Sequence, residues 1–215
     1  MSTTPIAKIK NHRIFKRKET VGGILIIVFA ILLAITELIS NNLREQMLIS
    51  QNQEVNYSNW YQAKSIKQNL KENQLDLLQA LLQAGLIPKE EQQNFKNVIA
   101  HTKSMVIKYD AEKTELLLGS ANIPTKYWAQ DLDGKMGKII GVKEWGEKTL
   151  LYDGASQKMS MGKLLFQISI VLCVVCVIIR DNESLRTNFI VLSLFFGLIG
   201  ILSASYGLMQ ILWEV

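Results

Sequence analysis

The chain has 215 residues, of which 48% are hydrophobic, and its formal net charge is +5. That hydrophobic fraction is close to the globular average, so composition alone does not identify a membrane protein. Six Lys and Arg residues against one Glu in residues 1–20 account for the whole excess, so the remaining sequence is neutral and offers no basic surface for a nucleic-acid partner.

Residues 21–40 form the first long apolar segment and follow the basic residues 1–20. About 20 apolar residues are enough for one helix to cross the hydrocarbon core of a bilayer. A cleaved signal peptide is the alternative, but its apolar core is typically only about 7–15 residues long. No small-x-small cleavage site follows the segment, since its exit reads Leu38-Ile39-Ser40. We therefore expect an uncleaved signal anchor that forms the first transmembrane helix.

Glu37 is the one ionisable residue in this first apolar segment. An ionisable group inside a membrane span is a candidate for an ion or proton path. Glu37 lies within one helical turn of the polar residues 40–42, and no second charge within a span is available to pair with it. We therefore expect its side chain to extend to the interface, with an ion path as the alternative.

The polar residues 41–162 are expected to form a helical segment outside the bilayer. Apolar residues at steps of three and four predict two amphipathic helices, with Gly85 ending the first, Pro88 in the first turn of the second, and Gly119 ending the second. The expected apolar faces are Ala63, Ile66, Leu70, Asn73, Leu77, Ala80 and Ala84 on the first helix, widened by Leu78, Leu81 and Leu82, and Phe95, Val98, Ile99, Thr102, Met105, Val106 and Tyr109 on the second. Such an antiparallel hairpin has little core of its own, which favours a homo-oligomer or a membrane-protein partner.

Residues 120–162 are harder to assign because glycine is frequent among them. Pro124 is expected to start a short helix through Trp128 and Leu132, followed by a break and a helix that merges into the second apolar segment. The glycines that weaken any regular assignment are Gly134, Gly137, Gly141, Gly146 and Gly154.

Two further apolar segments, residues 163–179 and 189–213, are joined by the short loop 180–188. The segment 189–213 is uncharged throughout, whereas 163–179 becomes long enough to span only if the Lys163 side chain extends to the interface. Both are expected to be transmembrane helices that form a C-terminal hairpin.

The basic residues indicate the orientation of these segments. Lys and Arg gather in residues 1–20 and 180–188, so the positive-inside rule predicts both on the cytoplasmic side and residues 41–162 outside the cytoplasm. The expected fold is an all-α integral membrane protein with three transmembrane helices, one N-terminal and two in a C-terminal hairpin, plus a helical-hairpin extramembrane segment.

Small residues recur on one face of each apolar segment. Helices in lipid gain little from burying apolar surface, so close packing through small side chains drives their association. The expected helix-packing residues are Ser193, Gly197, Gly200, Ala204 and Gly207 on the third segment, Ser169, Cys173 and Cys176 on the second, and Gly23, Ala30 and Ala34 on the first. The CxxC pair Cys173 and Cys176 is interpreted as packing, because redox or metal chemistry needs an accessible thiolate, which hydrocarbon disfavours.

No pattern in the sequence is typical of an active site. The two histidines, His12 and His101, have no Cys or His partner at metal-ligand spacing. Phosphate-binding loops, dinucleotide glycine patterns and hydrolase nucleophile motifs are missing from the sequence. We therefore expect a protein that is not an enzyme and binds no cofactor and no metal ion.

The densest local pattern is Trp60-Tyr61-Gln62-Ala63-Lys64-Ser65-Ile66-Lys67. Its members Trp60, Tyr61, Gln62, Lys64 and Lys67 are candidates for binding a partner protein. The same aromatic side chains could instead complete the core of the hairpin, which is the interpretation that we favour.

This stretch resembles the signature of a family of bacterial membrane proteins catalogued as domain of unknown function 4337. The resemblance implies one span near the N-terminus, the motif beyond it, a helical segment and two C-terminal spans, in the inner membrane of a bacterium. It implies no activity, substrate or catalytic residue.

These observations together predict a non-enzymatic interaction or scaffold protein in the lipid bilayer, an oligomeric accessory subunit of a larger membrane assembly. The alternative is an oligomeric channel or transport component, in which several copies of the first span line a path near Glu37.

Overall fold

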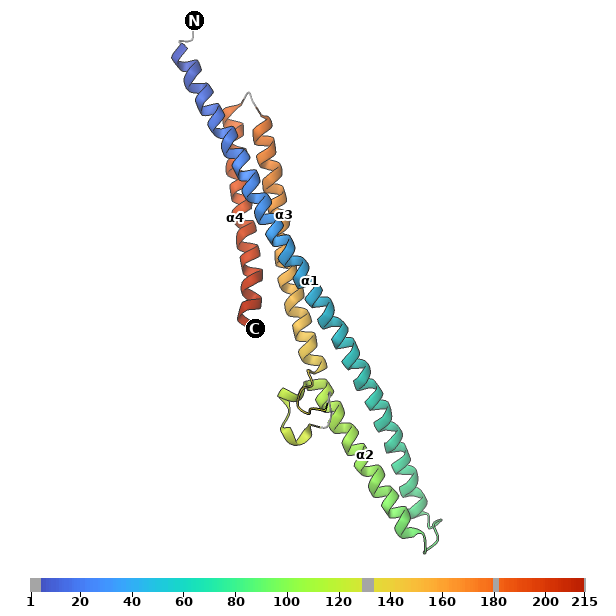
Figure 1. The fold of residues 1–215 in the computed structure, drawn as a ribbon. Helices are drawn as coiled ribbons and strands as arrows, with labels where there is room; N and C mark the ends of the chain where they lie inside the picture. The colour runs from blue at the N-terminus through green and yellow to red at the C-terminus, as the bar shows by residue number, and fades with distance from the viewer. Residues whose placement is uncertain (1–4, 129–133, 180–181, 215) are drawn as a thin grey trace. The chain divides into compact units, whose positions relative to one another are not determined.

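The computed structural model describes residues 5–128, 134–179 and 182–214, with side chains for residues 19–213 of these ranges. The described residues form four α-helices and two 3-10 turns, with no β-strand among them (Figure 1). The elements are α1 (Pro5–Gln83), α2 (Gln92–Leu118), η1 (Ser120–Asn122), η2 (Thr125–Tyr127), α3 (Val142–Ile178) and α4 (Glu183–Glu214). The predicted all-helical class is confirmed.

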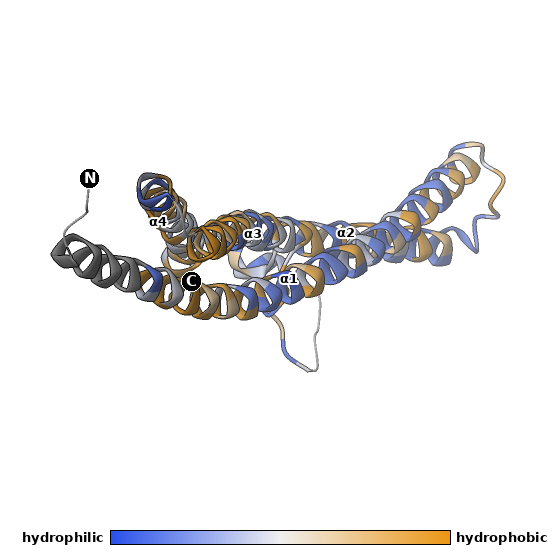
Figure 2. Cartoon of the chain, turned by 90° about the horizontal axis from the view of Figure 1, so that it is seen from above, coloured by the Kyte–Doolittle hydropathy of each residue, from blue (hydrophilic) through white to orange (hydrophobic). Residues whose placement is uncertain are grey.

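Helices α1, α3 and α4 each contain a stretch that is long and apolar enough to cross a membrane. The hydrophobic colour of Figure 2 covers much of α3 and α4 and part of α1, whereas α2 alternates between hydrophilic and hydrophobic patches. The three expected spans therefore correspond to helices of suitable length and composition.

The chain separates into two compact units according to its internal contacts. Residues 1–47 and 150–215 make up the first, which we term the bundle unit, and residues 48–149 make up the second, the hairpin unit. Helices α1 and α3 each contribute residues to both units.

In the bundle unit, α3 and α4 approach each other so closely that the contact positions need glycine. A Cβ atom at Gly162 would lie 3.0 Å from the carbonyl oxygen of Gly200 and 3.2 Å from the Cβ atom of Ala204. A Cβ atom at Gly207 would lie 3.0 Å from the carbonyl oxygen of Ala155. Backbone therefore packs against backbone along this pair of helices.

The small-residue strip predicted on the first apolar segment is wrong for contacts within the chain. A Cβ atom at Gly23 would meet nothing within 4 Å, and Ala30 and Ala34 are exposed. Helix α1 turns Phe29 inward instead, where a Cβ atom at Gly197 would overlap its ring. The small residues that α1 buries in this unit are Gly22, Thr36 and Ser40, which were not the ones predicted.

In the hairpin unit, α1 and α2 run antiparallel, as predicted. The first helix ends at Gln83 and Gly85 follows with a φ of +67°, a backbone conformation that favours glycine. Pro88 lies in the turn and not in the first turn of α2, which begins four residues later at Gln92.

The α1 face that packs on α2 includes only the wider part of the predicted face, because Leu78, Leu81 and Leu82 are half-buried whereas the stripe from Ala63 to Ala84 stays exposed. Ile66, Leu70 and Leu77 are 67%, 66% and 61% exposed, and the other members of that stripe are exposed as well. The face turned to α2 consists of buried or half-buried side chains, namely Tyr61, Lys64, Gln68, Leu75, Leu78 and Leu82. This face therefore combines leucines with the ionic and amide partners of α2.

The predicted face of α2 is mostly turned inward, because Phe95, Ile99, Thr102, Met105, Val106 and Tyr109 are buried or half-buried. Val98 is the exception and remains exposed.

The helix expected to merge into the second apolar segment is confirmed as α3 (Val142–Ile178). Helix α3 begins at Val142 and includes Gly146 and Gly154. Between α2 and α3, the described residues hold only the turns η1 and η2 in place of the helix predicted from Pro124, and Leu132 lies outside the described residues. The predicted loop 180–188 is also too long, since α4 already begins at Glu183.

Candidate functional site

The Trp60–Lys67 motif divides between two sides of α1. Trp60, Gln62 and Lys67 are exposed, whereas Tyr61 and Lys64 are half-buried and turned to α2. The helical repeat explains the division, because neighbouring residues point about 100° apart. The motif therefore serves two roles: some side chains hold the hairpin together and others remain available at its surface.

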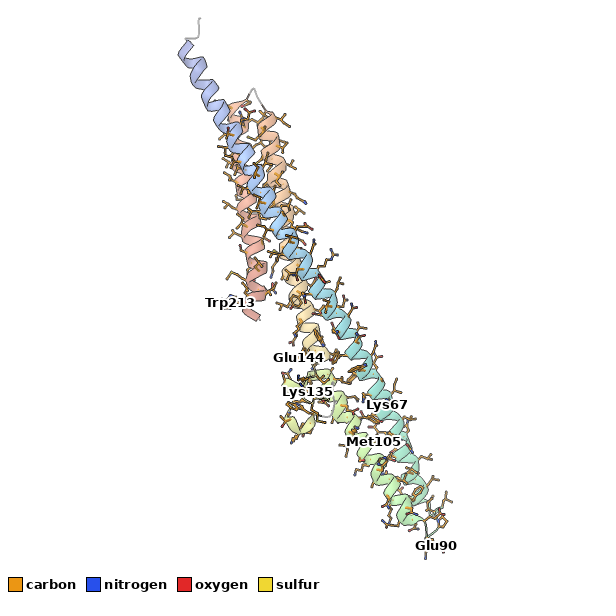
Figure 3. All side chains as sticks on the ribbon, in the orientation of Figure 1. Lys67, Glu90, Met105, Lys135, Glu144 and Trp213 are labelled. Carbon is orange, nitrogen blue, oxygen red and sulfur yellow. The ribbon has the colours of Figure 1, made fainter. Side chains whose placement is uncertain are left out.

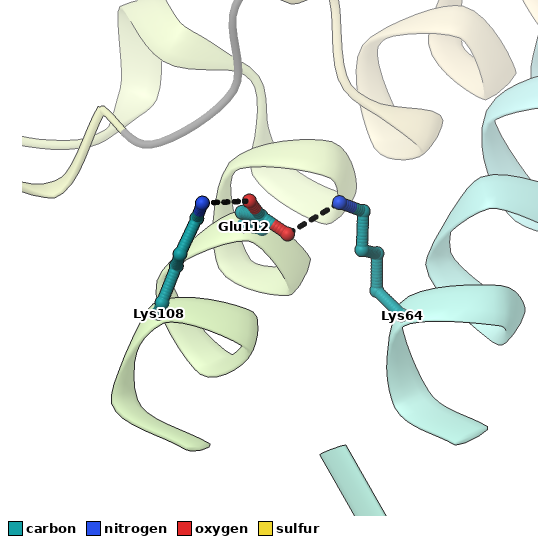
Figure 4. Close-up of polar contacts among 3 residues, drawn as sticks. All are labelled: Lys64, Lys108 and Glu112. Atoms are coloured by element: carbon teal, nitrogen blue, oxygen red, sulfur yellow. Dashed lines mark ion pairs between the residues drawn. The ribbon is translucent and has the colours of Figure 1, made fainter. Parts of the chain in front are cut away.

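Lys64 belongs to an ion-pair cluster inside the hairpin that is centred on Glu112 (Figure 4). Its ammonium lies 2.5 Å from a carboxylate oxygen of Glu112, and Lys108 lies 3.9 Å from the other oxygen. The Glu112 side chain is only 5% exposed, so its charge needs these cations in the folded state. Lys64 also lies over the Tyr109 ring, 5.7 Å from its centroid.

A second polar link joins the same helices one turn further along. Lys113 donates a hydrogen bond of 2.8 Å to Gln68, and Gln68 donates one of 2.8 Å to Glu72. The Lys113 ammonium lies 5.6 Å from the centroid of the Tyr61 ring. Paired polar groups of this kind fix the register of α1 against α2, because sliding by one turn would separate every partner.

Aromatic side chains cluster just before the motif. The Tyr57 ring centroid lies 5.4 Å from that of Trp60 and 6.4 Å from that of Trp145. Burial raises the pKa of the Tyr57 phenol above its ordinary value. The Trp145 indole nitrogen is buried and has no hydrogen-bond partner among the described residues.

Two surface hollows flank the motif. One of about 200 Å³ is lined by Trp60, Ala63, Lys64 and Lys67. The other, of about 380 Å³, is lined by Gln51, Glu54, Val55, Ser58, Asn59, Gln62 and Val142. The exposed members of the motif therefore border recesses that a side chain of a partner could enter.

Sequence reasoning missed a buried cluster at the end of α2. Ser120 donates a hydrogen bond of 2.7 Å to the fully buried Glu115 carboxylate and accepts one of 2.9 Å from the Ile139 amide. The Ser120 amide donates to the Ile139 carbonyl at 2.8 Å, and the Trp128 indole donates to the Ser120 carbonyl at 2.9 Å. This cluster closes the segment between α2 and α3.

Glu144, labelled in Figure 3, fixes the start of α3. Its carboxylate accepts hydrogen bonds of 2.8 Å from the Gly141 amide and 2.9 Å from the Asn122 side chain. A Glu three residues after the residue that precedes a helix is half of a capping box. That spacing was visible in the sequence and could have located the helix start.

In the bundle unit, Glu37 does have a charged partner, contrary to expectation. Its carboxylate lies 3.0 Å from the Lys163 ammonium, with the two side chains 47% and 20% exposed. Both groups were expected to extend separately to the interface. Because the two groups lie within ion-pair distance on packed helices, each neutralises the charge of the other.

The predicted helix-packing residues of α3 and α4 lie together. Ser169, Cys173, Cys176 and Ser193 are fully buried, and Gly197, Gly200 and Gly207 are buried too, with Ala204 half-buried. The Cys173 sulfur lies 2.8 Å from the Ser193 hydroxyl, and Ser193 donates a hydrogen bond to the Ser169 carbonyl.

No group of three His, Cys, Asp or Glu side chains that could hold a metal ion occurs among the described residues. His101 is exposed on α2, and the His12 side chain lies outside the described residues. The hairpin unit consists of α1 packed on α2, with Trp60, Gln62 and Lys67 exposed on α1.

The sequence pattern of the family described as "Domain of unknown function (DUF4337)" matches residues 18–210. The chain belongs to this family. The match covers the three apolar helices, the hairpin and the Trp60–Lys67 motif, so the resemblance drawn from that motif is confirmed. No curated protein and no solved structure is similar enough to the chain to count as a match.

Proposed function

We propose that this DUF4337 chain is a non-enzymatic integral membrane protein that acts as an interaction or scaffold subunit of a larger membrane assembly. The observation that carries the proposal is the division of the Trp60–Lys67 motif. Tyr61 and Lys64 brace the hairpin, which leaves Trp60, Gln62 and Lys67 exposed beside two hollows. Exposed tryptophan beside polar side chains is typical of binding surfaces.

The proposed setting is the inner membrane of a bacterium, with α1 as signal anchor and residues 41–162 outside the cytoplasm. The basic residues 1–20 favour this orientation through the positive-inside rule. Trp213, labelled on α4 in Figure 3, is exposed and has the amphipathic ring that suits a membrane interface.

The test compares exposed apolar positions on the two helices of the hairpin. The full chain is extracted from its own membrane in mild detergent, and the size of its complex is measured by native electrophoresis. Trp60→Ala is expected to reduce that size or the yield of the assembly, because it removes the exposed aromatic anchor. Val98→Ala, an exposed apolar position on α2, is the matched control. An unchanged complex in Trp60→Ala would refute this role.

The second candidate is an oligomeric channel or transport component, which the half-exposed Glu37 favours. Its pairing with Lys163 weakens this candidate, since a paired carboxylate is less free to bind a passing ion. Flux of small ions into liposomes that contain the purified chain distinguishes the two. The scaffold proposal expects no flux above that of empty liposomes, whereas flux that disappears in Glu37→Ala would establish the channel.

A further inference from the structure

Within the hairpin unit, α1 has two faces, and the described chain covers only one of them. The face with Tyr61, Lys64 and Gln68 packs on α2. The residues on roughly the opposite side, at 3.6 residues per turn, form what we term the open stripe. The open stripe consists of Ala63, Ile66, Leu70, Asn73, Leu77, Ala80 and Ala84, all of them exposed.

The open stripe is a continuous surface and not a set of scattered residues. Its three largest members, Ile66, Leu70 and Leu77, expose between 61% and 67% of their area. Single exposed apolar residues are common on proteins, but a contiguous row marks a place where something binds. A partner that covers it would gain binding free energy, because burial of apolar surface contributes about 25 cal/mol per Å².

The spacing of the open stripe specifies what kind of partner fits. Alternating steps of three and four residues are the heptad pattern by which one helix packs on another. The partner surface is therefore a helix with the same repeat.

The flanking residues favour a second copy of the same chain. The stripe is bordered by the neutral amides Gln62, Asn69, Gln74 and Gln83, with Lys67 and Asp76 as the charged exceptions. In a parallel pair, Gln62 faces Lys67 of the second copy and Asn69 faces Gln74 of the second copy. Asp76 faces the apolar Leu81 of the second copy, so no like charges meet, and the first two facing pairs can form hydrogen bonds.

Asn73 distinguishes a parallel second copy from an antiparallel one. It is a polar residue in the middle of an apolar stripe, and an amide buried against an apolar partner loses its hydrogen bonds to water. A parallel copy in register places Asn73 opposite its own equivalent, where each amide donates to the other. In an antiparallel pair the a positions face d positions, so Asn73 would face an apolar residue such as Leu70. A lone Asn in a heptad seam is known to select register in this way.

We infer that a second copy of this chain covers the open stripe, parallel and in register, with the two Asn73 side chains paired across the interface. The inference rests on the proposed function in one respect. Copies inserted into one bilayer with the same topology reach the stripe after the same number of residues, so they meet without an offset.

The first test measures the mass of the full chain in mild detergent, with the detergent contribution subtracted. The parent is expected to have at least twice the 24.3 kDa of one chain. The double variant Leu70→Lys, Leu77→Lys is expected to fall to one chain at the same concentration, which requires at least an about tenfold weaker association, ~1.4 kcal/mol. Both residues are exposed within the chain, so its helical circular dichroism should not change.

The matched control is the double variant Val98→Lys, Ile107→Lys, which places the same charges on exposed apolar positions of α2. It is expected to keep the mass of the parent. A monomeric parent, an oligomeric stripe variant, or equal dissociation of the control would each overturn the inference.

The second test reports register. Asn73→Cys is treated in membranes with copper phenanthroline, which accepts the electrons as two thiols lose their protons and join in a disulfide between copies. Gln79→Cys, exposed on α1 but off the stripe, is the control, and the parent reports on Cys173 and Cys176. Crosslinking at Asn73→Cys at least about tenfold faster than at Gln79→Cys is expected, a ratio worth ~1.4 kcal/mol. Equal rates would overturn the parallel register.

A sedimentation measurement on the same sample separates the two proposals. A chain that pellets with membranes but is monomeric in detergent contradicts the inference and leaves the membrane assignment standing. A chain that forms the Asn73→Cys disulfide but stays in solution without detergent contradicts the proposed function and leaves the pairing of stripes standing.

Discussion

The bundle unit and the hairpin unit are both made of packed α-helices, yet different groups lie between their helices. In the bundle unit, the contacts centre on glycines, where a Cβ atom at Gly162 would already press on the backbone of α4. In the hairpin unit, they centre on charged and amide side chains such as Lys64 and Gln68. Helices therefore associate in one unit by close approach and in the other by specific pairing.

The surroundings proposed for each unit, lipid for the bundle unit and water for the hairpin unit, account for the difference. A helix bundle suited to lipid gains nothing by hiding leucine, so its apolar residues point outward and its small ones inward. A hairpin in water can bury long polar side chains only when their charges are matched, as at Glu112. The open stripe on α1 breaks this pattern for a water-exposed helix, which is why it points to a further copy.

The largest effect is expected from Gly162→Leu in the bundle unit. The new side chain would collide with the Gly200 carbonyl oxygen and Ala204, neither of which is the end of a flexible side chain. Overpacking of this kind should destabilise the unit by about 3 kcal/mol. Resistance to thermal unfolding in detergent measures it, and Gly23→Leu, which meets open space, should behave like the parent. If both variants are equally stable, close approach is not what holds this bundle.

An intermediate effect is expected from Glu112→Ala in the hairpin unit. The change removes the buried partner of Lys64 and should destabilise the hairpin by about 2 kcal/mol, the scale of a lost buried polar interaction. Hydrogen exchange of the α1 and α2 amides within this unit is the measurement. Glu90→Ala, at an exposed turn position, is the control and should leave exchange unchanged. Equal protection in both variants would show that the ion pair adds nothing to the hairpin.

The smallest effect concerns the ionisation of Tyr57. Burial raises its pKa in the folded state above the ordinary value of about 10. The folded chain therefore holds this proton more tightly, so the associated stability is fully present below pH ~10 and is lost as the pH rises through the raised pKa. Tyr57→Phe cannot ionise, so its hairpin should lose less stability between about pH 9 and 11 than the parent. An identical pH dependence of unfolding in both chains would contradict the prediction.

The helices that the structure contains could largely be predicted from the sequence. Long apolar segments, Gly85 and Gly119 were strong enough signals to locate three apolar helices and the hairpin. These signals are local, because a run of apolar residues or a glycine with positive φ determines its own stretch of backbone.

The faces of the helices were harder to predict. The stripe through Leu70 was expected to form the core of the hairpin, since its residues recur at steps of three and four. Pairing with Glu112 and Lys113, some 45 residues away along the chain, selected another face instead. The same limitation hid the pair of Glu37 and Lys163, because only the packing of α1 on α3 brings these residues together.

For the same reason, the sequence could not show which side chains of the candidate site face outward. Sequence spacing identified Trp60–Lys67 as unusual but could not separate Tyr61, which faces α2, from Trp60, which faces outward. Whether any of these residues binds a partner stays a prediction. The cluster of Glu115, Ser120 and Ile139 could not be predicted at all, since these residues come into contact only in the folded chain.

That closure has a practical consequence. Because Ser120 and Ile139 exchange hydrogen bonds, the two ends of the segment between them are held together. Lengthening a loop whose ends are joined costs little free energy, about 0.6 kcal/mol of closure entropy for each doubling of its length. A short epitope placed between Gly134 and Lys135, where a side chain at Gly134 would meet open space, should leave both helices intact. Antibody access to that epitope in intact and opened cells would then reveal on which side of the envelope membrane the hairpin resides.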